Sequence, residues 1–241
     1  MFWTPREERA ERIVHKEEFI RGVKDCVPTL LGYLSIGFAA GIIEKTAGLS
    51  IMEIGLLSVL VYAGSAQFIF AGMVSTGSSV VGIITTVFFV NLRHLLLSAA
   101  LSPYFRQLSS VKNAMIGVLL TDETFGVATS EVARSNQLNN SWMQGLNLTA
   151  YLNWIAANLA GAYLGVWITD PEKFGLDFAL PAMFIGLLVL QIMQRKRYVL
   201  DAVVGLSAIL VGVVCGFFIS ASVGVIAATI VAATVGTVIE R

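Results

Sequence analysis

The stretch IGLLSVLVYAGSAQFIFAGMVSTGSSVVGIITTVFFVNL, residues 54–92, contains no charged side chain. A helix needs about 20 mostly apolar residues to cross the hydrocarbon core of a bilayer. The stretch is long enough for two such crossings, with a break at the small and polar residues STGSS (75–79). It therefore predicts a membrane protein whose chain crosses the bilayer more than once.

The composition of the whole chain agrees with this prediction. Of the 241 residues, 56% are hydrophobic and 13% are charged, and the mean hydropathy is +0.77. In a soluble domain about a quarter of the residues are charged. The 16 basic residues balance the 16 acidic ones, which argues against a nucleic-acid-binding surface. Cys26 and Cys215 lack the spacing of a disulfide framework or a metal site, so we expect no metal and no cofactor.

The same length criterion predicts an all-α, polytopic fold of eight transmembrane helices. The first covers residues 26–43, the second precedes STGSS, and the third continues through Arg93 to about Leu101. The others are expected at 113–131, 145–169, 178–194 and twice within 202–239, with a break near SAS (220–222). Seven helices would result if the region around residues 64–67 is re-entrant and does not cross.

Residues 1–25 are predicted to form a cytoplasmic segment that precedes a transmembrane domain of residues 26–241. The segment is too long and too acidic for the leading region of a cleaved signal peptide. We expect a short amphipathic helix with Ile13, Phe19 and Ile20 on its apolar side, or alternatively a partly disordered tail.

Basic residues near helix ends predict the orientation of the chain, because they are enriched in cytoplasmic loops. The basic residues between 6 and 24 and the cluster RKR (195–197) place both termini in the cytoplasm. Arg106 and Lys112 would then lie outside, against the rule. GFAAG (37–41) also has a faint echo in GAYLG (161–165), which is typical of transporters built from two repeats but is short enough to arise by chance.

Two adjacent acids, Asp122 and Glu123 in LTDETFG (119–125), fall near the middle of the fourth predicted helix. A charged acid costs roughly 2.5–3.5 kcal/mol at that depth, more than the apolar residues around the pair return. Each acid must therefore be sheltered, paired or protonated. Adjacent helical residues point about 100° apart, so the two carboxylates should face different partners. A helix end that lies nearer the membrane interface is the alternative.

The basic counterpart lies in FVNLRHLLLS (89–98), where Arg93 and His94 follow Asn91 within the third helix. A buried arginine needs a carboxylate, backbone carbonyl groups or water. Since Asp122 and Glu123 are the acids inside a neighbouring helix, we expect Arg93 to pair with one of them. His94 could carry a proton or could only donate a structural hydrogen bond.

A third polar group interrupts the second helix, where YAGSAQF (62–68) contains Gly64, Ser65 and Gln67. Transporters form substrate sites from broken helices of this kind, so we predict a break here. Close packing around a hydrogen-bonded Gln67 is the alternative. The fifth helix also carries a polar face that should point toward protein or a cavity, formed by Asn147, Tyr151, Trp154, Asn158, Gly161 and Gly165.

Several function classes lack support. The sequence contains no HExxH, GxSxG or P-loop motif, which argues against an enzyme. It contains neither a series of voltage-sensing arginines nor a TVGYG filter, which argues against a channel. The GxxxG pairs at 37–41, 161–165 and 212–216 are expected for helix packing alone.

Three segments carry a resemblance to a known family. VYAGSAQFIFAGM (61–73), VNLRHLLLSAALSPYF (90–105) and LLTDETFGVA (119–128), in this order, resemble the AzlC family, the large subunits of bacterial branched-chain amino-acid exporters. GLDFALPAMFIGLLV (175–189) is similar to the second half of these proteins. The resemblance implies a bacterial inner-membrane protein that exports hydrophobic amino acids, driven by the proton gradient, together with a small AzlD-like membrane subunit. A homo-oligomer is also compatible with the sequence.

The residues themselves suggest how a zwitterionic substrate would be held. Arg93, or backbone N–H groups near residues 64–67, could bind the carboxylate, and Asp122 or Glu123 the ammonium group. We favour Asp122 as an acid that also exchanges protons, because small residues on its face leave room for substrate or water. Asn158 and His94 complete the predicted substrate or proton-coupling residues. A non-transporting membrane scaffold or sensor is the competing hypothesis.

Overall fold

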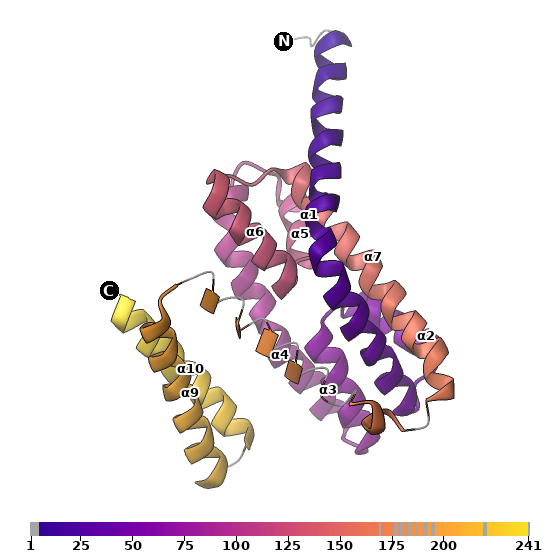
Figure 1. The fold of residues 1–241 in the computed structure, drawn as a ribbon, viewed down its shortest axis with the longest axis vertical. Helices are drawn as coiled ribbons and strands as arrows, with labels where there is room; N and C mark the ends of the chain where they lie inside the picture. The colour runs from indigo at the N-terminus through magenta and orange to yellow at the C-terminus, as the bar shows by residue number, and fades with distance from the viewer. Residues whose placement is uncertain are drawn as a thin grey trace. The chain divides into compact units, whose positions relative to one another are not determined.

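The computed structural model describes residues 5–168, 170–175, 178, 181–182, 185–186, 188–189, 192–193, 196–218 and 221–240. Within these residues every regular element is a helix, which confirms the all-α prediction. The chain divides into two compact units, Met1–Phe184 and Ile185–Arg241, which are described separately below. Figure 1 shows the helices of both units.

The longest helix, α1 (Pro5–Thr46), joins the predicted N-terminal segment and the first predicted transmembrane helix into one element. From Pro5 on the segment is helical, and it packs on protein. Its Phe19 lies against Gly145, and its Asp25 accepts a hydrogen bond from Trp142 Nε1 at 2.8 Å. Its place in the cytoplasm stays a prediction.

Helix α1 packs along the whole of α7 (Asn140–Leu164), and the two run in the same direction (Figure 1). Their backbones touch at glycines: a Cβ at Gly41 would lie 2.0 Å from the carbonyl oxygen of Asn158, and one at Gly161 would lie 2.1 Å from that of Phe38. The GxxxG pairs at 37–41 and 161–165 therefore face each other and allow close packing, as expected for such motifs.

The parallel direction of α1 and α7 constrains the crossings between them. If both helices span the bilayer, the chain between them must cross an odd number of times. Three crossings fit, whereas a single re-entrant segment in place of one of the three would make α1 and α7 antiparallel. The total number of transmembrane helices stays a prediction, because the sixth predicted helix (178–194) lies partly outside the described residues.

The second predicted helix is broken, as YAGSAQF suggested. Helix α2 (Ile51–Leu60) ends before residues 61–63, and α3 (Gly64–Ser75) begins after them. Tyr62 in this break has a φ of 44°, a left-handed conformation that non-glycine residues rarely adopt. After the STGSS turn, α4 (Val80–Leu101) continues through Arg93 as predicted and ends in the short helix η1 (Ser102–Phe105).

The fourth predicted helix, expected to be continuous over 113–131, is also broken. It consists of α5 (Ser110–Val118) and α6 (Asp122–Ser135), separated by residues 119–121. Thr121 caps α6, because its hydroxyl accepts the N–H of Thr124 while the Thr124 hydroxyl accepts the N–H of Thr121. Asp122 and Glu123 thus occupy the first turn of a helix, where the helix dipole favours negative charge.

Two short helices, η2 (Gly165–Trp167) and η3 (Pro171–Phe174), follow α7. The second unit contains α9 (Tyr198–Phe218) and α10 (Ala221–Glu240), which pack together at glycines: a Cβ at Gly224 would lie 2.8 Å from the Gly212 carbonyl oxygen. Among the described residues, three segments are long and apolar enough to span a membrane: Ile13–Thr46, Val80–Phe105 and Tyr198–Phe218. Residues 37–41 and 161–165, the two halves of the faint echo, lie on α1 and at the end of α7, and an internal repeat stays a prediction.

Candidate functional site

The breaks in the two interrupted helices meet at one small cavity. The first turns of α3 and α6, the middle of α4 and buried side chains of α1 and α7 all contribute to it. Its volume of about 10 Å³ is at the limit of what a single water molecule needs. The lining residues are Tyr33, Tyr62, Ala63, Gly64, Arg93, His94, Thr121, Asp122, Glu123 and Trp154.

An ion pair closes this cavity. Arg93 Nη1 contacts the Asp122 carboxylate, and Arg93 Nη2 donates a hydrogen bond to Ser65 Oγ at 2.8 Å. The side chains of Arg93 and Asp122 are only 23% and 18% exposed, so the pair is well shielded. The expected pairing of Arg93 with an acid of α6 is confirmed, and Asp122 is the partner. One arginine thereby ties α4 to the first turns of both α3 and α6.

Glu123 faces a different partner, as the helix geometry predicted. Tyr33 donates its hydroxyl hydrogen bond to Glu123 Oε2 at 2.9 Å, and the same hydroxyl also contacts the Thr121 hydroxyl. The Tyr33 ring packs edge-on against Trp154, with the ring centroids 5.6 Å apart. Tyr33 was not predicted from the sequence, although its spacing from Gly37 and Gly41 places all three residues on one face of α1.

His94 and Asn91 differ in their relation to the cavity. His94 Nδ1 lies 2.9 Å from the Leu120 carbonyl oxygen, and since a carbonyl only accepts, Nδ1 carries the proton. His94 Nε2 is buried without a hydrogen-bond partner among the described residues. Asn91, also a predicted site residue, does not line the cavity, and its buried Oδ1 likewise has no partner within the described part of the chain.

A second polar cluster surrounds Gln67 and is wholly buried. Gln67 Nε2 donates to Glu44 Oε1 at 2.9 Å and lies 3.3 Å from Ser58 Oγ and 3.4 Å from Asn158 Oδ1. Gln67 Oε1 accepts the Trp154 Nε1–H at 2.8 Å, and Asn158 Nδ2 donates to the Trp154 carbonyl oxygen at 2.9 Å. The amide of Gln67 thus joins α1, α2, α3 and α7.

Sequence reasoning missed Glu44, the only carboxylate of this cluster. It directly follows the uncharged run 26–43 and precedes Lys45, a position typical of the polar end of a transmembrane helix. Its side chain is nevertheless fully buried. Helical spacing was the available signal, because Gly37, Gly41 and Glu44 share the face of α1 that packs on α7.

The first turn of α3 connects the two clusters. Ser65 accepts the hydrogen bond from Arg93, while Gln67, two residues later, binds Glu44 and Trp154. Gly64 lines the small cavity directly. The structure therefore gathers seven of the nine predicted residues around one cavity and one turn, adds Asn158 through Gln67, and leaves Asn91 apart.

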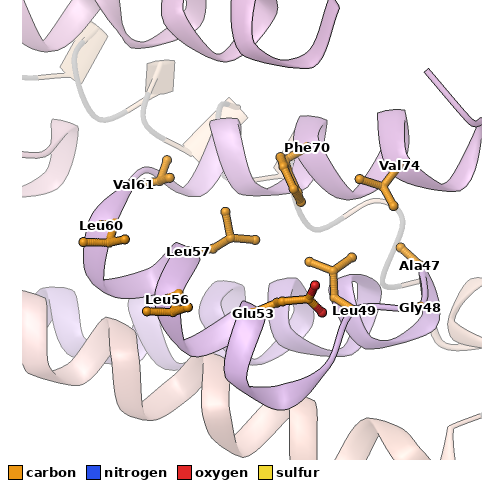
Figure 2. Close-up of a pocket in the computed structure, with 10 residues that line it drawn as sticks. All are labelled: Ala47, Gly48, Leu49, Glu53, Leu56, Leu57, Leu60, Val61, Phe70 and Val74. Carbon is orange, nitrogen blue, oxygen red and sulfur yellow. The ribbon is translucent and has the colours of Figure 1, made fainter. Parts of the chain in front are cut away.

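A larger hollow of about 390 Å³ lies between α2 and α3 and extends to the turn after α1. Figure 2 shows that aliphatic side chains and Phe70 surround it, with the Glu53 carboxylate beside Leu49. Glu53 is held there by Ser50, whose backbone N–H and hydroxyl both donate to Glu53 Oε2 at 2.7 Å. The hollow shares no residue with either polar cluster, and the sequence analysis did not predict it.

The opposite end of α6 is also attached to α1. Arg21 Nη1 donates to Glu131 Oε1 at 2.9 Å, and Arg134 Nη2 donates to Glu131 Oε2 at 2.6 Å. Arg21 also bonds Glu18 on its own helix at 2.8 Å. Both ends of α6 are therefore held by charged side chains, through Asp122 at its start and Glu131 near its end.

Comparison with known proteins places this arrangement in a family. The sequence matches the AzlC protein family over residues 28–168, more than half of the chain. It is 32% identical to the inner membrane protein YgaZ of Escherichia coli, over 82% of this chain and 87% of the relative. It is 26% identical to the branched-chain amino acid transport protein AzlC of Bacillus subtilis, over 71% and 67% of the two chains. No solved structure matches the chain. The chain is therefore a member of the AzlC family of membrane transport proteins.

Proposed function

We propose that the protein exports hydrophobic amino acids, branched-chain ones in particular, across the bacterial inner membrane. The observation that carries the proposal is the ion pair that Arg93 of α4 forms with Asp122, beside the first turns of the interrupted helices α3 and α6. Half-helix N-termini near mid-membrane are typical of transporter substrate sites. The name of the Bacillus subtilis relative supports branched-chain amino acids as the substrate class.

A zwitterionic amino acid is complementary to this ion pair. Its carboxylate can replace Asp122 on Arg93 and accept hydrogen bonds from the free N–H groups that begin α3, where the helix dipole favours an anion. Its ammonium group can replace Arg93 on Asp122. Each charge then exchanges one partner for another, and the net charge of the site does not change. Substrate entry therefore leaves no buried charge without a partner, which would be expensive.

The remaining walls of the cavity suit an apolar side chain. Tyr33, Tyr62, Ala63 and Trp154 are all buried and contribute rings or methyl groups. The cavity volume of about 10 Å³ is too small for any amino acid, so the described conformation is closed. Binding requires the first turns of α3 and α6 to separate, which the interruptions of the two helices at 61–63 and 119–121 would permit.

Outward direction, proton coupling and a small AzlD-like partner subunit complete the proposal, with both termini in the cytoplasm. The sequence favoured Asp122 as the acid that exchanges protons. Because Asp122 is the partner of Arg93, we assign it to the substrate ammonium group instead. A separate acid must then carry the proton.

Flux of labelled valine in proteoliposomes, with and without the small subunit, tests the proposal. Arg93→Gln should lower valine exchange by roughly 30-fold or more, since losing a shielded charged partner costs about 2 kcal/mol at least. Arg106→Gln is the matched control, because Arg106 is an exposed arginine after the same helix. Valine binding without any flux would support the scaffold or sensor hypothesis, and equal flux in both variants would refute the assigned site.

A further inference from the structure

Glu44 is a fully buried carboxyl group that the proposed substrate site does not use. Its Oε1 accepts one hydrogen bond from the Gln67 amide at 2.9 Å. Its Oε2 is buried and has no hydrogen-bond partner among the described residues. A carboxylate with one neutral donor and no cation is costly to bury, whereas a neutral carboxylic acid is far less so. The surroundings therefore favour the protonated form of Glu44.

The charged groups on the elements around Glu44 point elsewhere. On α1, Lys45 Nζ donates to the Leu49 carbonyl oxygen. On α2, the exposed Glu53 is bonded to Ser50, and on η3 the exposed Lys173 is paired with Asp170.

Helices α3 and α7 contain no Asp, Glu, Lys, Arg or His at all, and neither does η2. The tyrosine hydroxyl groups of α7 do not bind Glu44 either. Tyr151 donates to the Val59 carbonyl oxygen, and Tyr163 is exposed. Within the described residues, the Glu44 carboxyl group has the Gln67 amide as its hydrogen-bond partner and forms no ion pair.

We propose that Glu44 binds the proton that this transporter exchanges for its substrate, an inference that rests on the proposed function. In the closed conformation Glu44 holds one proton on Oε2. When the cluster opens to water on one side, the proton leaves as hydronium and a carboxylate remains. When it opens on the other side, Oε2 takes one proton back. One proton therefore crosses the membrane in each cycle.

The first turn of α3 supplies the mechanical connection to the substrate site. A charged acceptor binds an N–H group more strongly than a neutral one, so loss of the proton tightens the Gln67–Glu44 hydrogen bond. Ser65, in the same turn, holds Arg93 at 2.8 Å. Movement of this turn changes the hydrogen bond between Ser65 and Arg93, and therefore the affinity of Arg93 for the substrate carboxylate. Trp154 adds a second connection, because it binds Gln67 and lines the cavity.

Two other acids are the competitors for this role, and the structure separates them from Glu44. Asp122 is already paired with Arg93 and is assigned to the substrate ammonium group. Glu123 is only partly buried and accepts the Tyr33 hydroxyl hydrogen bond. Only Glu44 combines complete burial with an oxygen that has no partner within the described residues.

The test compares two kinds of valine transport by Glu44→Gln in proteoliposomes that contain the small subunit. Exchange at equal valine concentrations on both sides should stay within about twofold of wild type, because the neutral amide mimics the protonated acid. Accumulation driven by a pH gradient should fall by about tenfold or more, the size expected when two coupled sites are disconnected. Glu53→Gln, a nearby exposed acid, is the matched control and should change neither.

Gradient-driven accumulation that survives in Glu44→Gln, or is lost in Glu123→Gln instead, overturns the inference. Infrared spectra keep the test decisive if Glu44→Gln does not fold. Wild type and Glu123→Gln should both show the band of a buried protonated carboxyl group, and added valine should change the frequency or intensity of this band. If the band is missing from either protein, or does not respond to valine, the role of Glu44 is refuted. If wild type moves no valine in either assay, the proposed function fails, while the infrared band still reports whether Glu44 holds a proton.

Discussion

The α1–α7 pair and the two interrupted helices differ in continuity and packing, although they belong to the same unit. In the pair, long continuous helices approach so closely that glycines are required at the contact. The interrupted helices are α2–α3 and α5–α6. Each is interrupted for three residues, and charged and polar side chains lie at the interruption. The contrast is between a frame of two continuous helices, α1 and α7, and four shorter helices whose breaks carry the charged and polar side chains.

The largest loss of stability should come from the interrupted region. Arg93→Ala leaves the Asp122 carboxylate shielded and without its ion-pair partner, which should cost about 3–5 kcal/mol. Thermal unfolding of the purified protein in detergent, followed by size-exclusion chromatography, measures the change.

A second substitution sharpens this result. Adding Asp122→Asn to Arg93→Ala removes the unpaired charge and should restore part of the folded yield, whereas adding Glu123→Gln should not. Equal rescue by both would mean that the two acids share Arg93, and the assignment of Asp122 alone as its partner would be wrong.

The next effect belongs to the α1–α7 frame. Gly41→Ala places a Cβ 2.0 Å from the Asn158 carbonyl oxygen, so the two helices must separate, at a cost of about 1–3 kcal/mol. Gly32→Ala on the same helix is the control, because a Cβ there meets no atom within 4 Å. If both variants unfold at the same temperature, the close approach of the frame does not contribute to stability.

The smallest effect concerns the cap of α6. Thr121→Ala removes the hydroxyl that accepts the Thr124 N–H, which should lower stability by about 1 kcal/mol. Thr121→Ser keeps this hydroxyl and should behave like wild type in the same thermal assay. A loss in Thr121→Ser as large as in Thr121→Ala would show that the methyl group, and not the cap, matters.

The sequence predicted the periodic parts of this fold and missed what depends on tertiary contact. The break at STGSS and the course of α4 through Arg93 follow from composition. The scarcity of intramembrane charges predicted that Arg93 pairs with Asp122 or Glu123, and the structure selects Asp122. The break before Asp122 was missed because residues 113–131 have the length of one continuous transmembrane helix, although Thr121 and Thr124 have the spacing of reciprocal caps. Glu44 was missed because burial at the end of an apolar run is decided by the partner helix.

The parallel pairing of α1 with α7 has a consequence for how the protein is made. Residues in contact across this pair are separated by about 120 positions, as between Gly41 and Asn158. At a synthesis rate of about 5–20 residues per second, α1 leaves the ribosome on the order of ten seconds before α7 exists. During that interval its glycine face and Glu44 have no native neighbour from α7. The nascent first helix, which carries an acidic residue near one end, must therefore stay in the insertion machinery or at the lipid boundary. It is covered only when the fifth predicted transmembrane segment has been synthesised.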